Sequence, residues 1–267
     1  MENRGIPKVI HYCWFGGGEM PPLAYKCIES WHKFLPDFEI KRWDESNFDV
    51  SIIPYVSEAY KEGNYAFVSD YARVWIIYNY GGIYFDVDVE VVSPIYDIIG
   101  KGCFMGLDDN LRIMNVCLGL GFGGIKKLPI LKQVLDIYAN MNFILEDGSH
   151  NSYGIVPLVT DLLKKNGLKE ENRVQTVENI TVYPWDYFCP INYTSGEIKI
   201  TRNTRTIHHF TSLWMPPVDQ KANYWRWRLK WLRYPLNASV GRIIATFQVY
   251  GIKRFFPEIM KWLRHKN

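Results

Sequence analysis

Two aspartates separated by one residue, Asp86 and Asp88, are the side chains in this sequence best suited to chemistry. They lie in residues 81–92, where alternating β-branched or aromatic and polar residues predict a strand with both carboxylates and Glu90 on one face. Neighbouring carboxylates repel each other, and a hard cation such as Mg²⁺ or Mn²⁺ removes that repulsion while leaving positions for phosphate oxygens. The alternative is an exposed acidic strand face, because Asp-x-Asp alone is a common tripeptide.

The segment before this strand has the pattern of an amphipathic helix. Residues 65–80 place Phe67, Tyr71 and Val74 on one apolar face, and a glycine pair follows at the position where helices end. Asp70 and Arg73 are three residues apart on this helix, the spacing of an ion pair along one face.

The rest of the chain alternates strands with helices. Strands are expected at residues 8–15, 38–43, 103–106, 117–122, around 182 and 198, and at 206–210; helices are expected at 21–35, 54–62, 128–141 and 156–165. This order predicts an α/β fold with a sheet of parallel character. Ligands of such sheets bind beyond the carboxyl ends of the strands, and Asp86 and Asp88 lie towards such an end.

Length and cysteine usage indicate the class of protein. A chain of 267 residues fits one large domain, or one domain with an appendage. Its five cysteines are odd in number and form no Cys-x-x-Cys, which favours a reducing compartment. The first residues do not have a signal-peptide pattern, and no stretch is apolar enough to cross a bilayer. We therefore expect a cytoplasmic protein.

Charge divides the chain into two parts. From residue 221 onward there are 11 bases and one acid, a net charge of 11 − 1 = +10, which leaves 3 − 10 = −7 for residues 1–220. Aromatic and basic residues alternate within residues 224–234, and apolar faces follow in 243–250 and 252–263.

We expect a catalytic domain at 1–220 and a helical tail at 221–267. The tail suits an anionic membrane surface, with packing on the domain or on a second subunit as the alternative. The acidic body argues against nucleic acid as a partner.

Four motifs carry a resemblance to a known family. They are residues 69–73 (Ser-Asp-Tyr-Ala-Arg) leading into 80–88 (Tyr-Gly-Gly-Ile-Tyr-Phe-Asp-Val-Asp), residues 6–16, residues 207–214 (Ile-His-His-Phe-Thr-Ser-Leu-Trp), and Asn115. Together they resemble family 32 of the glycosyltransferases, which has the Asp-x-Asp sugar-binding motif and includes capsular-polysaccharide enzymes and yeast initiating mannosyltransferases. More distantly, they resemble the glucosyltransferase domains of large clostridial toxins. The resemblance covers roughly residues 5–215. The resemblance implies a Rossmann-like GT-A fold, a nucleotide-sugar donor and Mn²⁺ (or Mg²⁺).

The resemblance implies roles for the acidic residues and their arginine. Asp88 is expected to bind the metal directly, and Asp86 to contact the ribose and a metal-bound water. Asp70 and Arg73 match the pair that contacts sugar hydroxyls and the ribose, a task suited to a carboxylate acceptor and a rigid fork of donors. The alternative for this pair is a helix salt bridge.

The resemblance also implies a set of substrate-binding residues. Trp14 is expected to stack on the nucleotide base, with a core tryptophan as the alternative. Tyr12 belongs to the same expected substrate-binding set. Asn115 is expected to bond a hydroxyl of the donor sugar.

The motif at residues 207–214 supplies the remaining expectations. His209 is favoured over its neighbour His208 as the metal ligand, with a structural histidine pair as the alternative. Ser212 and Trp214 resemble the donors that hold the β-phosphate. Leu213 separates these two residues, so the spacing departs from the Ser-Trp dipeptide of many members and is similar to that of the toxins.

The function implied is a retaining hexosyltransferase. It would move a hexose from a nucleotide-sugar, UDP being favoured over GDP, to a glycan or lipid-linked oligosaccharide in capsule, O-antigen or other surface polysaccharide synthesis. The protein could then be peripheral on the inner face of the membrane. Two other classes are weighed: a metal-dependent phosphohydrolase, whose further Asp/His motifs we do not find, and a non-catalytic sugar- or membrane-binding module.

Overall fold

The computed structural model describes residues 5–110, 113–151, 153–192, 196–211, 215, 217–232 and 235–264. The chain divides into two compact units. The first consists of Met1–Ile191 with Ile198–His209, and the second of Asn192–Glu197 with Phe210–Asn267. Each unit is described by itself.

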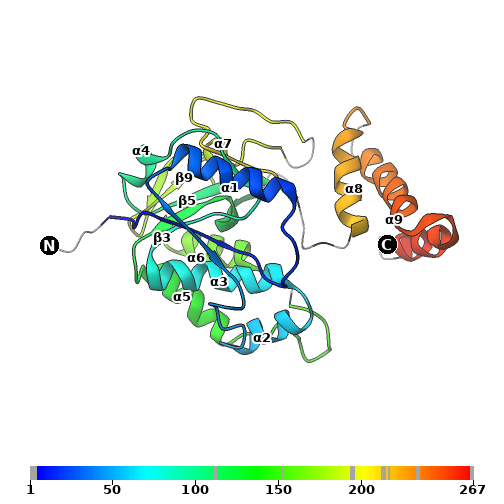
Figure 1. The fold of residues 1–267 in the computed structure, drawn as a ribbon, viewed down its shortest axis with the longest axis horizontal. Helices are drawn as coiled ribbons and strands as arrows, with labels where there is room; N and C mark the ends of the chain where they lie inside the picture. Colours follow the sequence, from blue (N-terminus) through cyan, green and yellow to red (C-terminus); the bar gives the residue numbers. More distant parts are fainter. Residues whose placement is uncertain are drawn as a thin grey trace. The chain divides into compact units, whose positions relative to one another are not determined.

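A mixed β-sheet forms the centre of the first unit (Figure 1). Its strand order is β2 (Glu39–Trp43), β1 (Val9–Cys13), β3 (Gly82–Tyr84), β7 (Phe122–Gly124), β5 (Phe104–Asn110), β9 (Ile180–Tyr183) and β8 (Gln175–Val177), with β6 (Ile113–Val116) paired to β5. The pairs β1–β2, β1–β3 and β5–β9 are parallel, and the other pairs in this sheet are antiparallel. A separate antiparallel pair joins β4 (Val89–Val91) to β10 (Thr206–His208).

Helices cover the sheet, with α3 and α5 side by side below the strands in Figure 1 and α1 above them. The helices are α1 (Pro22–Phe34), α2 (Pro54–Lys61), α3 (Tyr65–Tyr80), α4 (Tyr96–Ile99), α5 (Pro129–Ala139), α6 (Ile155–Lys165) and α7 (Trp185–Phe188). Proline occupies the first turn of α1, α2 and α5, where its fixed φ suits the helix and its missing N–H costs nothing. The predicted α/β class is confirmed.

Three of the predicted strands are wrong. Residues 81–92 form two short strands, β3 and β4, which belong to different sheets. Between them a turn is closed by the Val89 N–H donating to the Asp86 carbonyl at 3.0 Å, so both aspartates lie at the turn rather than on a continuous ladder. Residues 117–122 contain a 3-10 turn, Leu118–Leu120, ahead of β7. Ile198 makes an isolated bridge to Ile191.

Successive side chains of a strand point to opposite faces of the sheet, so one set packs against α1 and the other against α3. Trp31 of α1 lies against Tyr12 and Phe85, with ring centroids 5.7 and 5.5 Å apart. Tyr84 precedes Phe85 and therefore faces the opposite layer, where the Arg73 guanidinium of α3 lies over its ring at 5.1 Å. Asp86 comes two residues after Tyr84 and therefore points to the same face. Its carboxylate is thus directed towards α3.

His11 of β1 fixes the join between α3 and β3. Trp43 donates its indole N–H to His11 Nδ1 at 3.0 Å, so the neutral ring must donate from Nε2 to the Gly81 carbonyl, also at 3.0 Å. A Cβ at Gly82 would lie 2.9 Å from His11 Nε2 and 2.7 Å from the Val9 carbonyl oxygen, with φ at +109°. Only glycine suits that position.

Protonation of His11 is expected to destabilise the fold. Burial lowers the pKa of His11 from 6.5 to about 4, and a proton on Nδ1 would confront the indole N–H. The unfolded imidazole binds a proton below pH 6.5, whereas the folded one does so only below pH 4. The free energy of unfolding should therefore fall as pH drops through this window, by up to about 3 kcal/mol.

Urea unfolding of the wild type and of His11→Gln between these two pH values checks this prediction. The variant should lose that part of the pH dependence, while a control at the exposed His32 (His32→Gln) should keep it. An unchanged pH slope in His11→Gln would contradict the assignment.

The second unit is a helical hairpin of α8 (Pro217–Arg228) and α9 (Leu236–Arg264). At Gly241, a Cβ would lie 3.0 Å from the Ala222 carbonyl oxygen, so glycine permits the close approach of the two helices. Gly251, with φ 66° and ψ 177°, divides α9 into two helical halves. No helix in the described part of the chain combines the length and apolar character that a bilayer crossing needs.

Candidate active site

Arg73 of α3 holds two aspartates together at the centre of the candidate site. The guanidinium is buried; it lies 3.2 Å from Asp70 Oδ1 and 3.3 Å from Asp86 Oδ1, and its Nε donates to the Ser69 carbonyl at 3.1 Å. The helix ion pair considered for Asp70 and Arg73 is therefore present, and it extends to the first aspartate of the Asp-x-Asp motif. Because its donors point in fixed directions, an arginine orients both carboxylates at once.

Asp86 is held from several sides. The Tyr84 hydroxyl donates to Asp86 Oδ1 at 2.9 Å, and the Asp86 N–H donates to the Gly119 carbonyl at 3.3 Å. A Cβ at Gly119 would lie 2.3 Å from Asp86 Oδ2 and 3.1 Å from Arg73 Nη1. The absence of a side chain at Gly119 thus leaves room for the ion pair.

Asp88 meets His208 across the short β4–β10 pair. His208 lies opposite Val89 in the register of the two strands, and its Nε2 is 3.2 Å from Asp88 Oδ1 and 4.0 Å from Asp86 Oδ2. Ligand atoms of the two aspartates and the imidazole all lie within 4.8 Å of one another. Two carboxylates and one imidazole suit Mn²⁺ or Mg²⁺, so this donor set fits a divalent cation.

The structure places His208, rather than the favoured His209, with the aspartates. The His209 ring instead contacts Glu90, with Nε2 2.9 Å from Glu90 Oε2. The backbone N–H of His209 donates to the Asp88 carbonyl at 3.0 Å. Lys26 lies 3.2 Å from Glu90 on the same side. Successive side chains of a strand point to opposite faces, so one of two adjacent histidines faces the cluster and the other does not.

Burial controls the protonation of the cluster. It raises the pKa of Asp70 to about 6, against the opposing effects of Arg73 and of the Ile155 N–H at the start of α6. Burial also raises the pKa of Asp86, which Arg73 lowers and Asp88 raises further. Burial opposes the charged form of His208, but Asp88 and Asp86 outweigh it and raise the pKa of that imidazole. Excess negative charge is thus gathered where a cation would relieve it.

The two aromatic residues expected to bind substrate have different surroundings. The Tyr12 ring is buried against Trp31, in the layer opposite the acidic cluster. The Trp14 side chain is half-buried; its indole N–H donates to the Gly18 carbonyl at 2.7 Å, in the loop that follows β1. Trp14 is thus held by its own loop rather than placed in the core.

Asn115 lies on β6 directly opposite Asp108 of β5. The expected phosphate donors Ser212 and Trp214 lie outside the described residues.

Asp108 is a residue that the sequence analysis did not single out. It is buried, its charge contributes to the raised pKa of His208, and the Cys189 thiol donates to its Oδ1 at 3.8 Å. An acid in a mostly apolar strand was the available signal. Its closeness to His208 follows only from the fold, because the two residues are a hundred positions apart in the chain.

Parts of the chain are similar to known proteins. Residues 21–105 match the family model described as the glycosyltransferase sugar-binding region containing the DXD motif. An uncharacterized glycosyltransferase, L373, of Acanthamoeba polyphaga mimivirus is 26% identical over 260 residues, which is 88% of this chain and 100% of that protein.

Two further proteins are similar to part of this chain. Inositol phosphoceramide mannosyltransferase 3 of Schizosaccharomyces pombe is 35% identical over 146 residues, 53% of this chain and 41% of the mannosyltransferase. The chain thus spans less than half the length of that relative. The solved structure of the PaToxG glycosyltransferase has a TM-score of 0.47 at 19% identity, covering 61% of this chain and 69% of that one. Asp86-Val87-Asp88 lies inside the matched region, so the part of the chain that is similar to the DXD sugar-binding region of glycosyltransferases includes both aspartates of the acidic cluster.

Proposed function

We propose that this protein is a metal-dependent, retaining glycosyltransferase of GT-A type that moves a hexose from a UDP-sugar to a glycan acceptor. The observation that carries the proposal is the convergence of Asp86, Asp88 and His208, from two paired strands, beside the buried Arg73. An acidic surface of purely structural use would have no reason to place a buried carboxylate and a half-buried one beside a buried imidazole.

Each part of the cluster has a task in this reaction. A divalent cation held by Asp86, Asp88 and His208 supplies neutralisation of the negative charge that develops on the leaving diphosphate. Asp70 accepts from donor hydroxyls, and Arg73 keeps both aspartates in place. The expected catalytic set of Asp70, Arg73, Asp86 and Asp88 is retained in this proposal, with Asp86 as a contact to the ribose as well. Trp14, Asn115, Ser212 and Trp214 keep their proposed contacts to the donor, while the buried Tyr12 supports the strand.

The proposed chemistry keeps the anomeric configuration. The acceptor hydroxyl attacks the anomeric carbon from the face that the nucleoside diphosphate leaves, the bond from that carbon to the phosphate oxygen breaks, and the acceptor proton passes to the departing phosphate. A nucleophilic carboxylate is not required for this same-face attack.

One relative and the charge distribution support the acceptor and the location that we propose. One relative is named for transfer of mannose to inositol phosphoceramide, a lipid, which favours a glycolipid or lipid-linked oligosaccharide here. We propose a cytoplasmic enzyme at the inner face of the membrane that contributes to capsule, O-antigen or related surface polysaccharide. Nucleic acid is not among the proposed partners, because residues 1–220 carry a net charge of −7.

Release of free nucleoside diphosphate from a panel of UDP- and GDP-sugars, with and without Mn²⁺, tests the proposal. At least one donor should be turned over only with the metal, and the same donor should raise the unfolding temperature when Mn²⁺ is present. Turnover of simple phosphate esters instead would indicate a phosphohydrolase. Donor binding without any turnover or transfer would indicate a binding module.

The two adjacent histidines provide a matched pair for the same assay. His208→Gln should weaken Mn²⁺ activation by about tenfold or more, because it removes a candidate ligand, whereas His209→Gln should change it by less than about threefold. The reverse order would contradict the proposed ligand set.

A further inference from the structure

The C-terminal half of α9 presents an apolar stripe to solvent. Ile252, Phe256, Met260 and Leu263 are 71%, 69%, 52% and 43% exposed. At 3.6 residues per turn these four side chains fall within about 80° of one another around the helix axis. One side of the helix is therefore continuously apolar over its length.

The side of the same helix next to the stripe is already packed. Phe255 contacts Phe247 of the first half of α9, with ring centroids 6.1 Å apart, and the Arg242 guanidinium lies over the Trp262 ring at 5.9 Å. These contacts seat the helix after the turn at Gly251. The stripe therefore faces outward from a helix that has its own partner within the unit.

Cations border the stripe. Lys253, Arg254, Lys261 and Arg264 are all exposed, and on the helix they lie to one side of the apolar arc. Glu258 is the single acid of the segment, and Arg254 donates to it at 2.8 Å. The segment follows the pattern of helices that lie in the plane of a lipid–water interface, with apolar groups below and cations at the level of the head groups.

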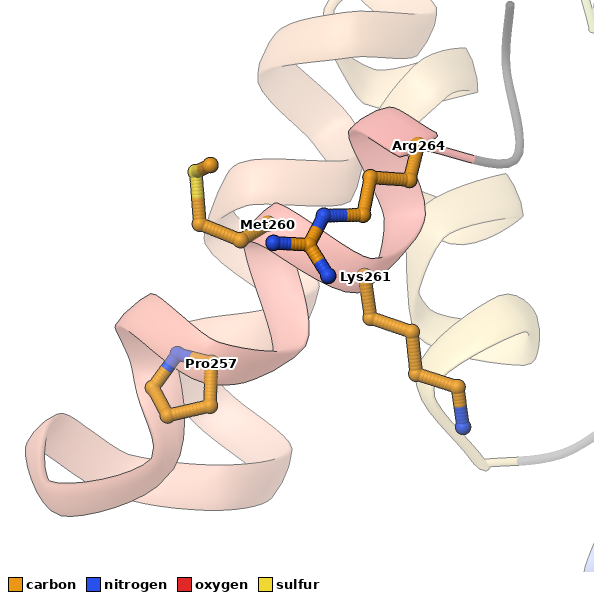
Figure 2. A pocket seen from close by; sticks show the side chains of 4 residues that line it. All are labelled: Pro257, Met260, Lys261 and Arg264. Carbon is orange, nitrogen blue, oxygen red and sulfur yellow. The ribbon is translucent and has the colours of Figure 1, made fainter.

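A hollow at the end of this helix combines both kinds of side chain. It is lined by Pro257, Met260, Lys261 and Arg264. Figure 2 shows the Arg264 side chain reaching towards Met260, whereas the Lys261 side chain extends away from Pro257 and Met260. Such a lining offers donors for a phosphate oxygen next to a surface for hydrocarbon.

We propose that this face of α9 docks on an anionic lipid bilayer, with the apolar stripe in the acyl boundary and the four cations at the head-group phosphates. A second copy of the chain is disfavoured as the occupant, because a symmetric contact would bring like charges together. The benefit of docking rests on the proposed transferase activity, since it would bring the active site to lipid-linked acceptors. Docking is measured as vesicle binding, which does not depend on sugar transfer.

Vesicle flotation of the full chain tests the proposal. Vesicles of phosphatidylcholine with about 30 mol% phosphatidylglycerol should bind the wild type at least about tenfold more tightly than pure phosphatidylcholine, and raising NaCl from about 0.1 to 0.5 M should weaken binding. Ile252→Glu and Phe256→Glu should each weaken binding by about tenfold or more. Ile200→Glu, at an apolar residue of the first unit with 56% exposure, is the matched control and should bind as the wild type does.

Charge reversal gives a second arm. Lys261→Glu with Arg264→Glu should reduce binding to anionic vesicles, whereas Lys126→Glu in the first unit should not. Circular dichroism of each variant confirms that the fold is kept.

Equal binding to neutral and anionic vesicles would overturn the proposal, as would unchanged binding of Phe256→Glu. A wild-type dimer that Phe256→Glu converts to a monomer, without vesicle binding, would also overturn it and make a second copy the occupant. Donor turnover in solution should be the same in all these variants, which separates failure of docking from failure of the proposed function.

Discussion

Replacing Asp88 by asparagine is expected to reduce sugar transfer by at least about a thousandfold. The buried Asp88 carboxylate lies 3.2 Å from His208 Nε2, and ligand atoms of Asp86, Asp88 and His208 lie within 4.8 Å of one another. Asparagine has nearly the same shape but no charge, so the cluster would keep its packing while losing a ligand that a hard cation prefers. Steady-state kinetics over a range of Mn²⁺ concentrations measure the loss.

The matched control for Asp88→Asn is Glu90→Gln, the next acid on the same segment. Glu90 bonds His209 at 2.9 Å and Lys26 at 3.2 Å, away from the proposed ligands, so its loss should change the rate by less than about fivefold. The substitution removes the repulsion between Asp86 and Asp88 and also the charge that raises the pKa of His208, so circular dichroism checks that Asp88→Asn keeps its fold. Full Mn²⁺-dependent activity in Asp88→Asn would contradict the role assigned to this residue.

The helices were predictable from the sequence because each buries one stripe of apolar residues. The pattern placed α3 at residues 65–80, and the structure has it at Tyr65–Tyr80. Proline at the start of α2 and glycine after α3 mark these ends in the sequence itself. The Asp-x-Asp pair was identified for a comparable reason, since the motifs at residues 69–73 and 80–88 are local features of the sequence.

The local sequence pattern did not predict which side chains of a short strand point to which face of the sheet. Choosing between His208 and His209 requires knowing that β10 pairs with β4 in a register that sets His208 opposite Val89. The break between β3 and β4 depends on the two strands joining different sheets, and the alternation of residues 81–92 does not contain that information. Asp108 and Gly119 were missed because each acquires its significance from a distant partner.

Arg73 shows how the fold itself maintains the site. Burial of a guanidinium is costly unless its donors are satisfied, and here they are satisfied by Asp70, Asp86 and the Ser69 carbonyl. Conversely, the two half-buried carboxylates are tolerated next to each other because Arg73 lies between them. Geometry at this centre is therefore sensitive to any group that enters the space around the ion pair.

Replacing Gly119 by alanine is expected to lower kcat/KM by about a hundredfold while leaving the protein folded. The added Cβ would lie 2.3 Å from Asp86 Oδ2 and 3.1 Å from Arg73 Nη1, which forces the carboxylate to move. Asp86 would then lose its bond from the Tyr84 hydroxyl or its contact with Arg73, and misplacement by about 1 Å is enough for an effect of this size. Stability should fall by only about 1–3 kcal/mol, the usual cost of a local overpacking.

A second glycine beside the same cluster makes the comparison for Gly119→Ala strict. At Gly154 a Cβ would lie 3.7 Å from Asp70 Oδ2, an ordinary contact, so Gly154→Ala should stay within about threefold of the wild-type kcat/KM. Both variants add one methyl group next to a half-buried aspartate, and they differ in whether that methyl displaces it. If Gly119→Ala kept wild-type kinetics and Mn²⁺ activation, the position of the Asp86 carboxylate would not matter to the reaction. The proposed role of the ion pair would then have to be abandoned.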